Sequence, residues 1–165
     1  MAAADLNAIR ARLEIHLLAG FGVDLAAQNN DILISENGFT IVTESLSTDA
    51  VPFVFRNQAY EPTPGSSFIQ CLTVFGSTSY LTLGGTTDSF NQINGNIQAN
   101  VFTPLGTGPG ANYELADRIC ALYTRNIIDE IQIGPPTGPG VVAAPQPSTF
   151  FQTAISFPFN VVEHL

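Results

Sequence analysis

One pattern in the sequence has glycine spacing that fits cofactor chemistry, Gly106-x-Gly108-x-x-Ala111. In dinucleotide-binding proteins such a loop follows a strand and opens a helix, so that backbone amides approach a pyrophosphate, and an acidic residue about twenty positions later binds the ribose. Asp129 stands at that distance. Against this interpretation, Pro109 lacks the amide that a phosphate would use, and no second strand-helix unit follows. A dinucleotide-binding enzyme is therefore kept only as an alternative.

Other side chains that commonly catalyse reactions are few and scattered. His16 and His164 lie near opposite ends of the chain, and the Gly-x-Ser-x-Gly motif of hydrolases is absent from the sequence. Glu114 and Asp117 lie one helical turn apart and suit a hard cation, although a solvated helix face is the simpler interpretation. The sequence thus predicts no catalytic residue, no metal or cofactor site, and a protein that is not an enzyme.

The charge of the chain is sparse and one-sided. Fourteen acidic residues face five basic ones, which gives a formal net charge of −9, and all five bases are arginine. The absence of lysine excludes a P-loop lysine and any Schiff-base chemistry. An acidic protein also repels DNA phosphates, so sequence-specific binding of nucleic acid is not expected. The same charge is compatible with a surface past which DNA slides without adhering.

The length and the cysteine content predict one soluble domain over residues 1–165. Cys71 and Cys120 fall within apolar patterns of a strand and a helix, which is typical of buried, reduced cysteines. No basic leader precedes an apolar run at the N-terminus, and no apolar run reaches the length of a membrane span. We therefore expect a protein that stays in a reducing compartment and makes no contact with a membrane.

Residues 90–101 have the alternation of a half-buried strand. Small or apolar residues occupy one side, and five carboxamides occupy the other: Gln92, Asn94, Asn96, Gln98 and Asn100. The carboxamide side either faces solvent or forms an uncharged polar surface that docks the sheet edge of another protein or lines a channel. A turn at Asn94-Gly95, which would break the strand, is the alternative.

The period changes to that of a helix after the glycine-proline loop. Over residues 111–127 the apolar stripe consists of Tyr113, Ala116, Ile119, Cys120, Tyr123 and Ile127. Asn112 is a candidate N-cap, and Glu114 precedes Arg118 with the favourable i,i+4 polarity.

A first helix is predicted over residues 4–20. Its apolar stripe repeats at steps of three and four through Leu6, Ile9, Leu13 and Leu17, and Arg10 pairs with Glu14 outside. His16 borders this stripe and is expected to be a structural boundary histidine. Ile15 and Leu18 lie off the stripe, which indicates a second buried surface, made either by local packing or by a partner chain.

The remaining segments predict strands. Asn37-Gly38 marks a β-hairpin over residues 31–44, and further strands are expected at 51–55, 68–75, 80–83, 129–133 and 150–161. The stretch 134–140 has too many prolines for regular structure, and Pro158 favours an edge position or a frayed end for the last strand. Asp129 and Glu130 would then point to opposite faces of their strand. This order predicts an α+β fold with a single mixed, mostly antiparallel sheet and both helices packed on one face.

Several weak motifs in this order resemble the phage tail terminator or tail-completion proteins, a family that includes domains described as minor tail proteins. They are the Ala8-Ile9-Arg10-Ala11-x-Leu13-Glu14 helix, the run from Phe55-x-Asn57 to Tyr60-x-Pro62, Pro64-Gly65 before a strand, Gly95-x-Ile97-x-Ala99-x-Val101 leading to Gly108-Pro109-Gly110, Ala116-Asp117, and the strand at 154–159. Phe55 replaces a tryptophan common in the family, and the 31–44 hairpin looks like an insertion.

The resemblance implies a homo-oligomeric ring, typically of six copies, without a cofactor. Such a ring caps the finished tail tube at the head-proximal end of the virion, joins it to the head-completion or neck protein, and lets DNA pass through its lumen. Assembly would take place in the host cytoplasm. The residues expected at subunit or partner contacts are Ile15, Leu18, Asn57, Tyr60, Glu114, Arg118 and Arg125. Another neck or tail tube subunit, and a carbohydrate- or receptor-binding module, are the alternatives.

Overall fold

The computed structural model describes residues 6–21, 51–82, 89–143 and 149–164. The hairpin expected at 31–44 lies outside these residues and stays a prediction. The elements in chain order are α1 (Leu6–Gly20), β1 (Phe53–Phe55), β2 (Phe68–Tyr80), β3 (Phe90–Pro104), α2 (Gly110–Tyr123), β4 (Ile127–Ile128), β5 (Ile131–Ile133), β6 (Thr137–Val141) and β7 (Phe150–His164).

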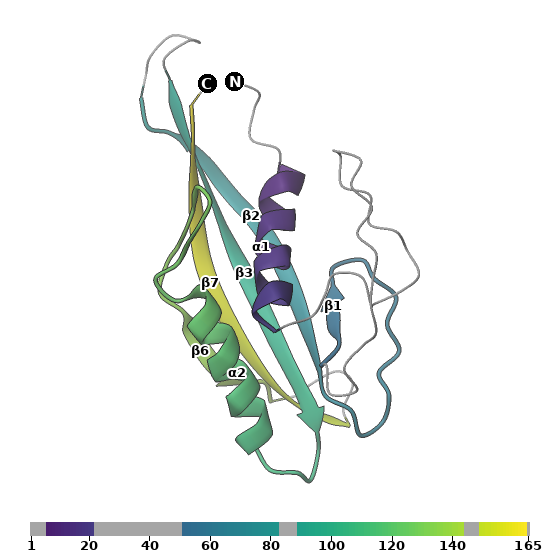
Figure 1. Ribbon diagram of the computed structural model, residues 1–165. Coiled ribbons are helices and arrows are strands. Elements are labelled where there is room, and N and C mark those ends of the chain that lie inside the picture. Colours follow the sequence, from purple (N-terminus) through teal and green to yellow (C-terminus); the bar gives the residue numbers. More distant parts are fainter. Residues whose placement is uncertain (1–5, 22–50, 83–88, 144–148, 165) are drawn as a thin grey trace.

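The strands form one sheet in the order β1-β2-β3-β7-β5-β4, and β6 also pairs with β7. The β1–β2 pair is parallel, and every other described pair is antiparallel. Figure 1 shows α1 and α2 on the same face of the long strands β2, β3 and β7, whose far ends extend beyond the helices. The α+β fold with a mixed, mostly antiparallel sheet and both helices on one face is therefore confirmed.

β3 is the central strand that the alternation predicted. It pairs with β7 along its whole length, from Phe90 opposite His164 to Pro104 opposite Phe150, and with β2 on its other side. Ile93, Ile97, Ala99 and Val101 are buried towards the helices. The strand runs without a break through Asn94-Gly95, so the alternative turn there is wrong.

α1 packs its predicted stripe on the sheet. Ile9, Leu13 and Leu17 are buried, and the Arg10–Glu14 ion pair forms at 3.8 Å. Leu6, which was also placed on the stripe, is 46% exposed, because it lies at the first turn of the helix. The hydroxyl of Tyr123 on α2 donates a hydrogen bond to Leu13 O at 2.8 Å, which ties the two helices together.

Glu14 gives α1 a pH dependence. Burial raises the pKa of its carboxyl above the ordinary 4.5, against the opposing effect of Arg10. The folded state thus holds this proton more tightly than the unfolded chain, and stability falls as the pH rises through the raised pKa. We expect Glu14→Gln to raise the free energy of unfolding at pH 7 by less than about 1 kcal/mol, with no gain below pH 4. Denaturant melts at several pH values test this, and a loss of stability at pH 7 would contradict it. Glu114→Gln on the exposed side of α2 is the control.

α2 is shorter than predicted, and its predicted stripe is buried only in part, at Ala116, Ile119 and Tyr123. It ends at Tyr123 rather than 127, because Arg125 has a φ of 55° and Ile127 belongs to β4. Asn112 is not the N-cap: Pro109 takes that position without a side-chain cap, and Asn112 is fully buried inside the helix. Tyr113 and Ile127, expected inside, are 38% and 65% exposed.

Asn112 joins α2 to the two central strands. Its Nδ2 lies within hydrogen-bond distance of three acceptors, Val101 O at 3.0 Å, Thr103 Oγ1 at 3.3 Å and Phe151 O at 3.4 Å. Its Oδ1 accepts a hydrogen bond from Thr153 Oγ1 at 2.5 Å. Since a buried amide is costly unless it is bonded, this cluster specifies how the helix sits on β3 and β7.

The positions of Pro158 and Pro139 in the sheet differ from the sequence-based expectation. β7 is an inner strand rather than an edge, because β3 lies on one side and β5 and β6 on the other. Pro158 O accepts from Gly134 N at 2.7 Å. Its ring nitrogen therefore also points to the gap between β5 and β6, where no donor is needed. The stretch 134–140 is irregular only over residues 134–136, because β6 begins at Thr137 and pairs with β7. Pro139 falls at the register shift between Thr137 and Gly140.

The strand boundaries in β2 and β4–β5 also differ. The segment expected at 68–75 continues to Tyr80 as one strand, β2, whose register shifts between Phe75 and Thr78. Of the separate strand expected at 80–83, Leu81 and Thr82 are not in a strand, and residue 83 lies outside the described residues. Asp129 and Glu130 lie in the turn between β4 and β5 rather than on a strand, and Asp129 has a φ of 54°. They therefore do not alternate across a strand.

Candidate functional site

The glycine loop does not form the setting that a dinucleotide site requires. β3, the strand before the loop, is antiparallel to both of its neighbours, and α2 leads into the short β4–β5 hairpin. A strand-helix-parallel-strand unit is thus missing from the described part of the fold. Asp129 follows the C-terminus of α2, whereas the loop precedes its N-terminus, and a helix of 14 residues is about 20 Å long. Asp129 forms an ion pair with Arg12 at 3.4 Å.

The other candidate chemical groups have structural partners or lie apart. His16 Nε2 lies 3.1 Å from Leu122 O and 3.1 Å from Asn126 Nδ2, so His16 is the boundary histidine that the sequence predicted. Burial raises the pKa of the Cys71 thiol to about 12, which disfavours the reactive thiolate. Cys120 is only half-buried. Among the described residues, no three histidine, cysteine or acidic side chains gather as a metal site would need.

Two of the seven expected interface residues have intramolecular roles. Leu18 is buried in the core, with 6% of its surface exposed. The guanidinium of Arg118 lies 4.2 Å from the centre of the Phe21 ring, and its Nη2 donates to Gly20 O at 3.3 Å. It does not pair with Glu114 in the described contacts. Arg118 thus holds α2 to the end of α1, and Leu18 is not accessible to a partner.

The expected Asn57 and Tyr60 belong to the turn after β1. Asn57 has a φ of 66°, and Gln58 closes the turn by accepting from Phe55 N at 2.9 Å. The Tyr60 ring lies 5.1 Å from the ring of Phe68 and is 37% exposed. The motif around Asn57 therefore shapes a loop, and Tyr60 both covers an aromatic cluster and reaches solvent.

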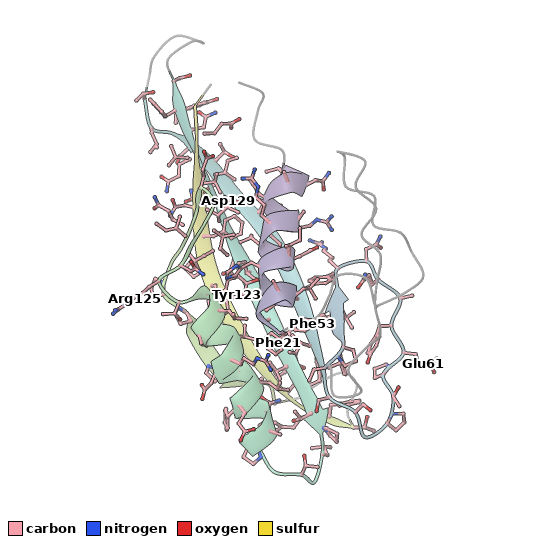
Figure 2. All side chains as sticks on the ribbon, in the orientation of Figure 1. Phe21, Phe53, Glu61, Tyr123, Arg125 and Asp129 are labelled. Carbon is pink, nitrogen blue, oxygen red and sulfur yellow. The ribbon has the colours of Figure 1, made fainter. Side chains whose placement is uncertain are left out.

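The seven residues do not form one surface. Asn57 and Tyr60 lie beside β1, at one end of the strand order. Arg125 lies in the short connection between α2 and β4, at the other end, and Figure 2 shows its side chain pointing outward there. Ile15 is 46% exposed on α1, and Glu114 is exposed on α2.

The carboxamide side of β3 is part of a larger uncharged surface. The pairing registers place side chains from β2 and β7 on the same side, away from the helices. We call this surface the carboxamide face; it consists of Gln70, Leu72, Val74, Gln92, Asn94, Asn96, Gln98, Asn100, Ser156, Pro158, Asn160 and Val162. It contains no charged side chain, although the protein carries a net charge of −9. The sequence showed the β3 part, and the alternating polar positions of β7 were the signal for the rest.

Five of the seven side-chain amides in this face make hydrogen bonds, and three of these amides bond to one another. Gln98 Nε2 donates to Asn100 Oδ1 at 3.1 Å, and Asn100 Nδ2 donates to Gln70 Oε1 at 3.2 Å. Asn96 and Ser156 lie within hydrogen-bond distance through two atom pairs, at 2.6 and 2.9 Å. These bonds hold the amides involved in place and reduce their capacity to bind a ligand by further direct hydrogen bonds.

Comparisons with known proteins bear on the fold alone. No protein-family model matches the chain, and no curated protein matches it significantly. The chain is similar to a solved structure whose protein is named only by a sequence identifier, with a TM-score of 0.61, 17% identity and 96% of each chain covered. This similarity shows a shared architecture and does not indicate an activity.

The described helices are short. α1 has 15 residues and α2 has 14, and neither is long and apolar enough to cross a bilayer.

Proposed function

We propose that this protein is a structural component of a phage virion. It forms a ring, most simply of six copies, that terminates the tail tube and joins it to the head-side neck protein. The carboxamide face is the observation that supports this proposal most directly. A broad, ordered and uncharged polar face on an acidic protein suits a surface past which a polyanion moves without binding.

The charged side chains of the described residues lie outside the carboxamide face. Six copies with a charge of −9 each carry about −54, which repels DNA from the ring as a whole. Arginine and lysine are the groups that retain DNA, because they release counterions from phosphates, and the described positions of the carboxamide face contain neither. In the proposed ring this face lines the lumen, and DNA slides along uncharged side chains, most of whose amides already have hydrogen-bond partners within the protein.

This orientation makes a testable prediction about DNA. Gln92 and Val162 lie opposite each other on the carboxamide face. Replacing both with arginine is expected to make the assembled protein retain linear DNA at low salt, by about tenfold or more, and the effect should disappear at high salt. Electrophoretic mobility shifts measure it. The same two charges placed at Ala111 and Thr124, which are exposed at the two ends of α2, serve as the control. Equal DNA retention by both variants would contradict the orientation.

The virion role has its own experiment. Gold-labelled antibody against the chain is applied to tailed particles and to purified tails from the same host. Label at the head-proximal end of the tail supports a terminator. Label along the tube, or on the head side of the junction only, indicates one of the alternative tube or neck subunits. Particles without label would overturn the proposal.

A further inference from the structure

Three of the five arginines are engaged within the fold. Arg10 pairs with Glu14, Arg12 pairs with Asp129, and Arg118 lies on Phe21. Arg56 and Arg125 are exposed, and no ion pair joins either of them to another described residue. These two arginines lie beside opposite edges of the sheet.

Each of these edges carries the same three kinds of exposed side chain. Beside β1, the loop at 56–61 holds Arg56, Tyr60 and Glu61, and Tyr60 is 37% exposed. Beside β4, the segment at 125–130 holds Arg125, Ile127 and Glu130, and Ile127 is 65% exposed. β1 and β4 are the two ends of the strand order, and Figure 2 shows Glu61 and Arg125 pointing away from the molecule on opposite sides.

The two sets run in the same chemical order along the chain: a cation, an apolar side chain, then an anion. When such segments meet antiparallel, each cation faces an anion and the apolar side chains meet between them. We propose that the β4 edge of one copy docks on the β1 edge of the next, with Arg125 pairing with Glu61, Ile127 packing on Tyr60, and Glu130 pairing with Arg56. This inference rests on the proposed ring and names its subunit contact.

A second copy of this chain is the occupant that the charges favour. Copies with a net charge of −9 repel each other on average, so they associate only where opposite charges are aligned. Because the two edges differ, the contact is heterologous and is repeated from copy to copy, and it produces a ring when the rotation closes. The exposed Ile127 and Tyr60 add the apolar centre that stable contacts need.

Charge reversal tests this contact on the full chain. Arg125→Glu alone and Glu61→Arg alone are each expected to weaken assembly by about tenfold or more, measured by mass photometry over a dilution series. A one-to-one mixture of the two variants should assemble again, because every contact then joins opposite charges. The variant with both changes should also recover. Asp117→Arg, an equal charge change on the exposed side of α2, should leave assembly unchanged.

Circular dichroism checks that each variant is folded. Ile127→Asp, at an exposed site, is a second variant expected to weaken the contact between copies. Single variants that assemble like the wild type, or a mixture that fails to recover although both proteins are folded, would overturn the contact while leaving the ring intact. A wild-type protein that forms no ring would overturn both the contact and the proposed function.

Discussion

Asn112→Asp is expected to lower the free energy of unfolding by about 3 kcal/mol or more. The substitution keeps the shape of the side chain and the oxygen that accepts the hydrogen bond from the Thr153 hydroxyl. It removes the NH2 group that faces three acceptors, Val101 O, Thr103 Oγ1 and Phe151 O. A carboxylate would meet two backbone carbonyl oxygens at a site that is fully buried. Protonation relieves this repulsion, so the deficit should shrink at acidic pH.

Urea denaturation followed by circular dichroism measures the effect. Asn57→Asp is the matched control, since Asn57 is exposed in the loop after β1 and aspartate tolerates its positive φ. It should change stability by less than about 0.5 kcal/mol. Similar small losses in both variants would show that Asn112 does not connect α2 to the sheet as described.

Gly95→Ala is expected to cost about 2–3 kcal/mol. A Cβ at this position would lie 2.2 Å from Cζ of Phe159 and 2.8 Å from the carbonyl oxygen of Val74. The Phe159 ring is buried and packs edge-on against Phe75 at 5.9 Å, and the carbonyl belongs to the paired strand β2, so neither group has an easy route away. Glycine at 95 therefore allows the aromatic ring to cross β3.

Gly110→Ala, the same chemical change at another position, is expected to stabilise the protein. Gly110 opens α2, and a Cβ there meets nothing within 4 Å. Since alanine favours the helix, stability should rise by up to about 1 kcal/mol. Thermal melts of the two variants should move in opposite directions. A stabilising effect of alanine at Gly95 would contradict the packing of Phe159.

The sequence predicted the elements whose side chains alternate regularly. α1 buries one consistent side, and β3 does so from Asn91 to Ala99, so their periods of 3.6 and 2 are visible in the chain. The alternation at Phe157, Phe159 and Val161 likewise located β7. The sequence did not predict that β7 is an inner strand. An inner strand tolerates Pro158 only because its ring nitrogen faces the gap between β5 and β6, and this gap exists only in the folded sheet.

The misplaced features share a physical cause. Asn112 reads locally as a helix cap, yet its partners Thr103 and Thr153 come from two strands that only the folded sheet brings to it. β6 contains Gly138 and Pro139 and has no apolar alternation of its own, and it forms because β7 offers an edge. Local secondary-structure propensity does not predict such tertiary contacts.

The candidate site was predictable only in part. The carboxamides of β3 were evident, but the extent of the uncharged face required the registers of β2 and β7. Exposed arginines on α2 were expected to mark an interface, and Arg118 instead lies against Phe21. Periodicity shows which side of an element faces outward, but it does not show which exposed charge already has a partner.

Native mass spectrometry of the purified full-length chain at physiological ionic strength tests the central claim most directly. We expect a closed oligomer, at about 106 kDa for six chains of 17.6 kDa, that survives dilution into the micromolar range. A single species at the mass of one chain at every concentration, with the protein fully folded, would contradict it.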